Sequence, residues 1–225
     1  MTERKAMSES LYLGLILALA GGMLDAYTFL CRGEVFATAE TGNLVLLGLN
    51  IARGNVSEAM HYFFPVLAFA SGVFAAEALR YHLSPRPGLH WRQWVVLLEF
   101  IVLVIVAHIS SRHDWIANIL VSFASAVQVQ TFRKFRGYGC MTTMCTGNLR
   151  SGTELIFRHV TGRSGDGVET YYTLIGAFVL GAVISAYLSS GLGNRTVLVA
   201  CLPLILAFIL MFIKNDVHNR PDQTK

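Results

Sequence analysis

Two short Thr-Gly-Asn motifs are the features of this sequence most able to bind a ligand. Their residues are Thr41, Gly42 and Asn43 in the first, and Thr146, Gly147 and Asn148 in the second. Thr and Asn side chains accept hydrogen bonds from free N–H groups at the start of a helix, and Gly allows close approach of backbone or ligand. We therefore expect each motif to cap a short helix, the first over Thr41–Arg53. The N-terminal N–H groups of these helices would face an anion or a polar solute.

Several polar side chains near these motifs are candidates for a pathway through the protein. An ionisable group in the middle of a membrane-spanning helix costs at least ~2.5 kcal/mol, so such a residue is a functional candidate. The candidates within or beside apolar stretches are Asp25, Glu40, Glu99, Gln128, Gln130 and Arg150. We expect Asp25 and Glu40 to form a proton- or cation-linked site with Arg150 as their charge partner. The alternative is a structural ion pair, with both motifs serving only to pack helices.

The composition indicates that the elements positioning these residues lie in a membrane. Of the 225 residues, 54% are hydrophobic and 14% are charged, whereas an ordinary soluble domain has about 25% charged residues. The mean hydropathy of +0.52 is too high for one water-facing globule. This composition excludes a soluble enzyme, a disordered chain and a disulfide-rich secreted module. It predicts a polytopic membrane protein in contact with the lipid bilayer.

The sequence also argues against nucleic-acid, metal and cofactor chemistry. The formal net charge of +4 is not gathered in a basic run interleaved with aromatic residues, so we expect no nucleic-acid partner. The 4 cysteines lack the CxxC spacing of a metal or redox site, and the sequence has no HExxH or GxSxG motif. We therefore expect no metal, no cofactor and no catalytic residue, in a protein that is not an enzyme.

Six apolar windows are each long enough to cross a membrane, which requires about 20 mostly apolar residues. They are Tyr12–Leu30, Ala59–Ala76, Gln93–Ile109, Trp115–Phe132, Thr170–Asn194 and Thr196–Ile213. Two less apolar segments, 34–53 and 140–159, contain the motifs. Each could be a crossing helix, giving eight spans, or a re-entrant loop, giving six. The first window resembles a signal peptide, but five spans follow it, so we expect it to remain in the protein.

The distribution of basic residues favours six spans, because Lys and Arg are concentrated on the cytoplasmic side of membrane proteins. With six spans and a cytoplasmic N-terminus, thirteen Lys and Arg residues lie inside and four lie outside, leaving out Arg150 in its re-entrant segment. The outer four are Arg32, Arg53, Arg112 and Arg195. Eight spans would divide the basic residues nine to eight. We therefore expect six spans, with both termini in the cytoplasm.

The two halves of the chain carry an internal repeat. A shift of 105 residues places Thr41–Leu44 on Thr146–Leu149 and Asp25 on Gln130. Each half then consists of a span, a re-entrant segment and two further spans, over about 11–110 and 114–213. Because three spans is an odd number, the halves must have opposite orientations, as is common among transporters. The predicted fold is one all-α membrane domain, residues 1–225, with six transmembrane helices in two inverted three-span repeats, each containing a re-entrant half-helix.

The sequence resembles the YoaK-like family of bacterial membrane proteins, a family of unknown function. The residues that carry the resemblance are Gly21–Ala26, Thr41–Asn43 and Thr142–Leu149, and the likeness extends from about Leu11 to Ile213. It implies a multi-pass protein of the bacterial inner membrane and supplies no substrate. At Gln128–Gln130 this chain has Gln-Val-Gln where many relatives have Gln-Asn, so we expect no Asn function there.

These features favour a small secondary transporter or channel for a small polar solute or ion. Its binding site would lie at the paired motifs, near the middle of the membrane. The main alternative is a structural or assembly protein without transport activity, and a membrane-embedded enzyme is a weaker one. The sequence does not identify the solute, and it leaves room for a homo-oligomer.

Overall fold

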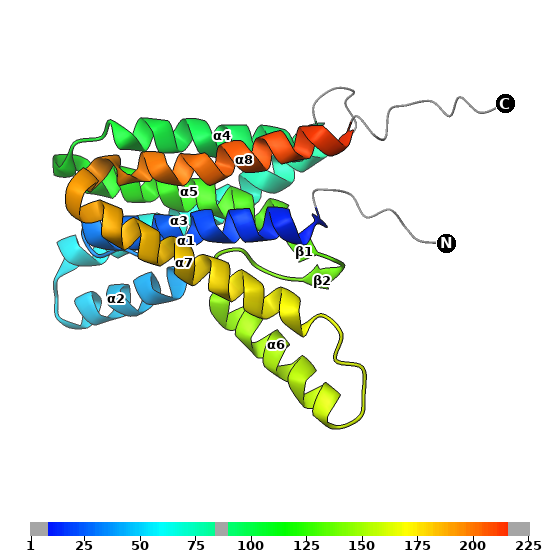
Figure 1. Cartoon of the computed structure of the whole chain (residues 1–225). Coiled ribbons are helices and arrows are strands. Elements are labelled where there is room, and N and C mark those ends of the chain that lie inside the picture. Colours follow the sequence, from blue (N-terminus) through cyan, green and yellow to red (C-terminus); the bar gives the residue numbers. More distant parts are fainter. Residues whose placement is uncertain (1–8, 84–89, 216–225) are drawn as a thin grey trace.

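The computed structural model describes residues 9–83 and 90–215, which form a helical bundle (Figure 1). The helices, in chain order, are α1 (Leu11–Cys31), α2 (Glu40–Ala52), α3 (Val56–Leu83), α4 (Trp91–Ala107), α5 (Asp114–Thr131), α6 (Cys145–Val160), α7 (Val168–Leu192) and α8 (Val197–Asn215). Short 3-10 turns precede α5 and α8, at η2 (Ser111–His113) and η3 (Gly193–Thr196). The predicted cytoplasmic location of the termini concerns residues 1–8 and 216–225, which lie outside the described residues.

Each of the six apolar windows predicted as a span lies in a helix or extends at most two residues beyond it, because long apolar runs bury their backbone polar groups in helical hydrogen bonds. By length and composition, Leu11–Cys31, Val56–Leu83 and Val168–Phe212 could each cross a membrane, the last running through α7, η3 and α8. Trp91–Ala107 and Ser111–Thr131 pass the same test together, although they are bent by 120°. The described residues thus supply three or four candidate spans, and the count of six stays a prediction.

Helices α1 and α5 occupy the middle of the bundle. α1 packs along α7 and also contacts α8, whereas α5 packs along α3 and also contacts α4. α4 and α8 pack against each other. The aliphatic core includes Leu17, Leu24, Leu103, Val121 and Leu204, all fully buried. Each of these central helices therefore has its longest contact with a helix from the other half of the chain.

Glycines bring the backbones of α1 and α7 into contact. A Cβ atom at Gly22 would lie 1.9 Å from a backbone carbonyl oxygen of α7, and one at Gly181 would lie 2.1 Å from a backbone carbonyl oxygen of α1. α3 and α5 cross in a similar way, since a Cβ atom at Gly72 would lie 2.5 Å from a carbonyl oxygen of α5. Small residues permit this close approach in membrane helices. Gly22, Gly72 and Gly181 thus lie at helix contacts that leave no room for a side chain.

The loop between α5 and α6 contains a two-stranded ribbon, which the all-α prediction missed. β1 (Lys134–Phe135) pairs antiparallel with β2 (Tyr138–Gly139). The intervening Arg136 and Gly137 both have positive φ, 53° and 89°. Positive φ at both central residues is the type I′ geometry, whose twist suits a two-residue hairpin.

The two helices that carry the motifs lie apart from the central bundle. In Figure 1, α2 and α6 begin near the middle of the bundle, leave it on the same side and point towards its opposite ends. α2 packs mainly on α3, and α6 mainly on α7. They contain 13 and 16 residues, fewer than the about 20 needed to cross a bilayer. The predicted short helix over Thr41–Arg53 is confirmed, with observed bounds Glu40–Ala52.

Candidate functional site

The Asn of each motif fastens its helix to the extended segment before it. The Asn43 amide nitrogen donates to the carbonyl oxygen of Phe36 at 3.0 Å, and its side-chain oxygen accepts from the Phe36 N–H at 3.3 Å. Asn148 makes the same two hydrogen bonds with Met141, at 2.6 and 3.1 Å. Both partners lie seven residues before their Asn. The two motifs therefore share one local geometry.

The predicted capping function of the motifs is wrong. α2 and α6 begin at Glu40 and Cys145, and neither helix has a side-chain cap. The Thr-Gly-Asn residues consequently lie inside the first turn. The side-chain oxygens of the two asparagines accept from backbone N–H groups of the preceding segments and not from the free N–H groups of α2 and α6. Only the two asparagines of the motifs are buried, whereas Thr41, Thr146 and Gly147 are exposed and Gly42 is partly buried.

We expect Asn43→Ala and Asn148→Ala each to lower the melting temperature of the purified protein. Each substitution leaves a peptide group of the preceding segment without its partner. A buried unsatisfied polar group costs about 1–3 kcal/mol, and because these hydrogen bonds are only partly buried, we expect the lower end of that range. Asn50→Ala is the control, because Asn50 bonds only to Leu46 within α2. If all three variants melted alike, the fastening function of the motif asparagines would be disproved.

Asp25 and Glu40 lie together where α1 meets the start of α2. The Asp25 carboxylate accepts from the N–H of Thr38 at 2.9 Å. Glu40 accepts from the amide of Asn43 at 2.8 Å and from the hydroxyl of Ser122 in α5. The two carboxylates are 6% and 8% exposed and are close enough to interact electrostatically. The structure thus brings these two predicted site residues together.

The start of α6 also approaches Asp25. The thiol of Cys145, the first residue of α6, lies within electrostatic reach of the Asp25 carboxylate. Thr143, just before α6, packs against α1 at Gly21, where a Cβ atom would lie 2.7 Å from the Thr143 methyl carbon. Asp25 follows Gly21 by one helical turn. The starts of both motif helices therefore converge on the same part of α1.

Arg150 is not part of this cluster, and its predicted pairing with Asp25 and Glu40 is wrong. Its side chain is 79% exposed and lies 3.9 Å from Glu154, one turn further along α6. Arg150 is two residues after the buried Asn148, and residues two apart do not share a helix face. Neither Asp25 nor Glu40 forms an ion pair with a basic residue within residues 9–83 and 90–215.

A second buried cluster joins α4, α5 and the loop before α6. Both carboxylate oxygens of Glu99 accept from the side-chain nitrogen of Gln128, at 3.0 and 3.2 Å. The side-chain oxygen of Gln128 accepts from the hydroxyl of Thr142 at 3.0 Å. All three residues are 1% exposed. Glu99 and Gln128 were predicted site residues, whereas Thr142 was not, because its residue type alone gives no signal.

Gln130 lies outside both buried clusters. Its amide donates to Glu77, whose carboxylate is also 3.7 Å from the guanidinium groups of Arg80 and Arg133. The Glu77 side chain is 46% exposed, so this group belongs to the surface. The cause is again helix geometry, because Gln130 follows Gln128 by two residues and faces another direction.

One face of α5 is polar along its length even though it is buried. Asn118, Ser122, Ser125 and Gln128 recur at intervals of three or four residues, which places them on one face, and each is 1% exposed or less. Asn118 donates to the carbonyl oxygen of Arg32, just after α1, and Ser122 and Gln128 donate to the two buried glutamates. The Ser125 hydroxyl has no hydrogen-bond partner among the described residues. This row was not predicted, although its spacing is visible in the sequence.

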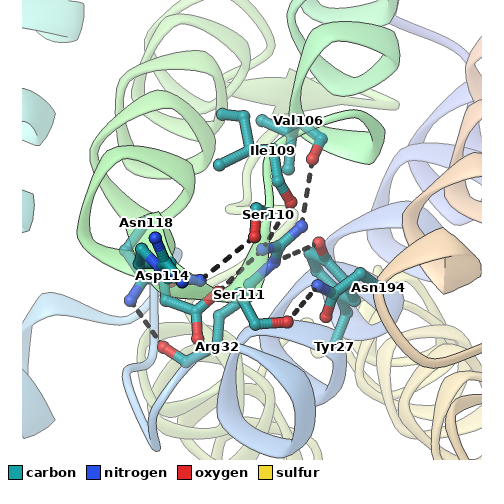
Figure 2. Close-up of polar contacts among 10 residues, drawn as sticks. Tyr27, Arg32, Val106, Ile109, Ser110, Ser111, Asp114, Asn118 and Asn194 are labelled. Atoms are coloured by element: carbon teal, nitrogen blue, oxygen red, sulfur yellow. Dashed lines mark hydrogen bonds and ion pairs between the residues drawn. The ribbon is translucent and has the colours of Figure 1, made fainter.

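Arg32 fixes the end of the bundle at which α4 meets α5 (Figure 2). Its fully buried side chain donates to the Tyr27 hydroxyl at 2.6 Å and to Asp114 at 2.7 Å. It also donates to the carbonyl oxygens of Val106 and Ile109, both at 3.0 Å. Val106 lies in the last turn of α4 and Ile109 two residues after its end, where helical partners run out. From the sequence, Arg32 was expected only to be an outer-loop charge.

Comparison with known proteins places these residues in a family. Residues 13–210 match the family described as protein of unknown function (DUF1275). This chain belongs to the DUF1275 family. The UPF0700 transmembrane protein YoaK of Bacillus subtilis (strain 168) is 27% identical over 155 residues, which cover 66% of this chain and 66% of YoaK. No solved structure matches the chain.

Membership of the DUF1275 family confirms the resemblance to YoaK-like proteins. Together with the apolar helices, it identifies a multi-pass membrane protein whose outer surface contacts lipid. Both motifs and both buried carboxylate clusters lie within the matched residues 13–210. Because the family description names no activity, the function of this DUF1275 protein has to be inferred from its site.

Proposed function

We propose that this DUF1275 protein is a transporter or channel for a small polar solute or ion, and that the species it binds is a small cation. The observation that carries the proposal is the pair of buried carboxylates, Asp25 and Glu40, which has no basic partner among the described residues. A buried carboxylate is costly unless it is neutralised by a proton or a cation. Within a membrane protein such residues mark substrate and ion pathways.

The proposed site has the composition that a small cation requires. Hard cations bind carboxylate, carbonyl and hydroxyl oxygens. Asp25 and Glu40 supply carboxylate oxygens, and the buried hydroxyl of Thr143 has no partner among the described residues. Thr143 packs against α1 one turn before Asp25, which supports its inclusion in the site.

We further propose six spans in two inverted repeats, in the bacterial inner membrane with both termini cytoplasmic. The packing supports this arrangement, because α1 to α4 of the first half correspond in order to α5 to α8 of the second, and corresponding helices make corresponding contacts. The contact of α1 with α7 corresponds to that of α5 with α3. Likewise, α2 with α3 corresponds to α6 with α7, and α1 with α8 to α5 with α4. The matching asparagine hydrogen bonds and the excess of basic residues on the predicted inner side add support.

In this proposal, α2 and α6 are re-entrant half-helices that enter from opposite faces of the membrane. Their length, their common origin near the middle of the bundle and their opposite directions in Figure 1 support it. Half-helices of this kind form binding sites near the midplane in many transporters. Irregular backbone at that depth is tolerated where it is covered by protein or lines a cavity.

The second candidate is a structural or assembly protein without transport activity. The observation that favours it is the use of both motif asparagines to fasten local backbone, which is a packing function. It leaves the unpaired carboxylates of Asp25 and Glu40 without a purpose, so we place it second. We do not propose catalysis, because the sequence lacks a recognisable catalytic constellation.

We expect Asp25→Asn to abolish cation binding while leaving the protein folded. A cation that binds only the folded state raises the free energy of unfolding by mass action, by about 2.7 kcal/mol at one hundred times its dissociation constant. The melting temperature rises accordingly. The measurement is a melting curve of the purified protein with sodium, potassium, ammonium or guanidinium chloride at constant ionic strength. At least one of these cations should stabilise the native protein and fail to stabilise Asp25→Asn.

The control is Asp166→Asn, because Asp166 is exposed and bonds only to Ser164 in the described structure. This variant should keep the full response to the stabilising cation, and flux of that cation into proteoliposomes should follow the same pattern. A well-folded Asp25→Asn protein with unchanged cation stabilisation and unchanged flux would refute the proposed site. Collapse of folding in Asp25→Asn alone would favour the structural alternative.

A further inference from the structure

Glu99 is a buried carboxylate that the proposed cation site does not use. It lies on α4, and both of its oxygens face one amide nitrogen, that of Gln128 on α5. From α8, the thiol of Cys201 lies within electrostatic reach of it. α3 and η3 also touch α4, but neither supplies a hydrogen bond or an ion pair to Glu99 among the described residues. No basic group therefore neutralises this carboxylate in the described part of the chain.

The geometry around Glu99 suits a proton better than a metal ion. A metal ion needs several oxygen ligands, whereas Gln128 presents its N–H₂ group to Glu99 and turns its oxygen away towards Thr142. A proton needs only one of the two carboxylate oxygens. Protonation also removes the charge that burial disfavours.

The amide of Gln128 can transmit the protonation state of Glu99 to the loop before α6. An ionised carboxylate only accepts hydrogen bonds, so the Gln128 nitrogen must face it and the Gln128 oxygen accepts from Thr142. A protonated Glu99 gains an O–H donor, which the Gln128 oxygen can accept after rotation of the amide by half a turn. The Gln128 nitrogen then donates to the Thr142 oxygen, and the Thr142 hydroxyl hydrogen must find another acceptor. The direction of the whole chain of hydrogen bonds is reversed.

We propose that Glu99 binds and releases a proton and that Gln128 passes this change to residues 140–144, the segment that leads into α6. Thr142 lies in that segment, and Asn148 fastens the segment to α6 through Met141. The thiol of Cys145 at the start of α6 lies within electrostatic reach of Asp25. The proton is thus linked to the cation site through a short run of contacts. This inference deepens the proposed function, on which it rests only in naming the proton as the coupling ion.

The test measures proton binding and loop response separately from transport. Infrared difference spectra of the purified protein, recorded from mildly acidic to mildly alkaline pH, should show the C=O band of a protonated carboxylic acid that is lost as pH rises. Glu99→Gln should abolish that band. Hydrogen exchange of residues 140–144, corrected for the intrinsic effect of pH, should change over the same range in the native protein. In Glu99→Gln it should stay at its acidic value.

Thr142→Val separates the relay from the proton site. It removes only the hydroxyl that bonds to Gln128, so the Glu99 band should remain while residues 140–144 cease to respond to pH. Thr170→Val is the matched control, because the buried hydroxyl of Thr170 has no hydrogen-bond partner among the described residues. It should preserve both the band and the response.

Two results would overturn the inference. One is a Glu99-dependent infrared band that does not change with pH. The other is a loop response that survives in Glu99→Gln or in Thr142→Val. Asp25→Asn distinguishes this inference from the proposed function, because it should lose cation stabilisation yet keep the Glu99 band. If no cation stabilises the native protein but the band and the loop respond to pH, the cation proposal fails and the proton site stands.

Discussion

Replacement of Arg32 by methionine is expected to destabilise the protein strongly. The substitution keeps a long side chain but leaves the Asp114 carboxylate and two carbonyl oxygens at the end of α4 without their buried donor. Removing one member of a buried ion pair costs about 3–5 kcal/mol. Because the Asp114 side chain is 23% exposed and water can reach it, we expect a cost at the lower end of this range. The measurement is the melting temperature of purified Arg32→Met beside that of the native protein.

Two further variants show whether the loss of stability in Arg32→Met comes from the buried contacts of Arg32 or only from the loss of a positive charge. Arg112→Met removes an exposed cation from the η2 turn at the same end of the bundle, and it should melt like the native protein. Arg32→Lys keeps the charge but loses the planar guanidinium group that reaches several acceptors at once. Its melting temperature should therefore fall between those of Arg32→Met and the native protein. Equal melting of Arg32→Met and Arg112→Met would show that the Arg32 contacts do not stabilise the fold.

The second large effect is expected from a single methyl group added between α1 and α7. In Gly22→Ala and Gly181→Ala the new Cβ atoms would lie 1.9 and 2.1 Å from backbone carbonyl oxygens. Backbone cannot move aside as a flexible side chain can, so the helices must separate. Overpacking of a core costs about 1–3 kcal/mol and occasionally more, and we expect both variants at the upper end.

Gly176→Ala is the matched control, because Gly176 lies on the same helix as Gly181 and a Cβ atom there meets nothing within 4 Å. Thermal unfolding and gel-filtration profiles in detergent would compare the three variants with the native protein. Gly176→Ala should be neutral. If Gly181→Ala also unfolded like the native protein, the close backbone contact between α1 and α7 would be disproved.

Much of the local structure could be predicted from the sequence. The apolar windows became helices because a long run of apolar residues has few other ways to pair its backbone. The short helix at Glu40–Ala52 followed from Gly and Asn beside an apolar segment. The approach of Asp25 to Glu40 was also expected, since both are acidic residues that precede the first motif. The helix predictions rest on signals within a few neighbouring residues.

The sequence-based predictions that were wrong concern the direction of side chains and contacts between residues far apart in the chain. Arg150 was assigned to the site by its distance along the chain from a motif, yet a two-residue offset turns it to the exposed face of α6. The motif asparagines were expected to cap helices that begin before them. Arg32 bonds to Asp114, which is 82 residues away in the chain, and no local sequence pattern predicts that contact. The polar row of α5 could have been predicted, because its regular spacing is visible in the sequence.

The pairing of α1 with α7 has a consequence for biosynthesis. The ribosome completes Leu11–Cys31 long before it begins Val168–Leu192, so the nascent α1 enters the bilayer without the helix that will cover its glycine face. Until then lipid or an insertase must shield Asp25, whose neighbours include the start of α6. Helices of membrane proteins insert first and associate afterwards. Neither half of this chain can therefore mature alone, and translation of the second half is the step that completes the first.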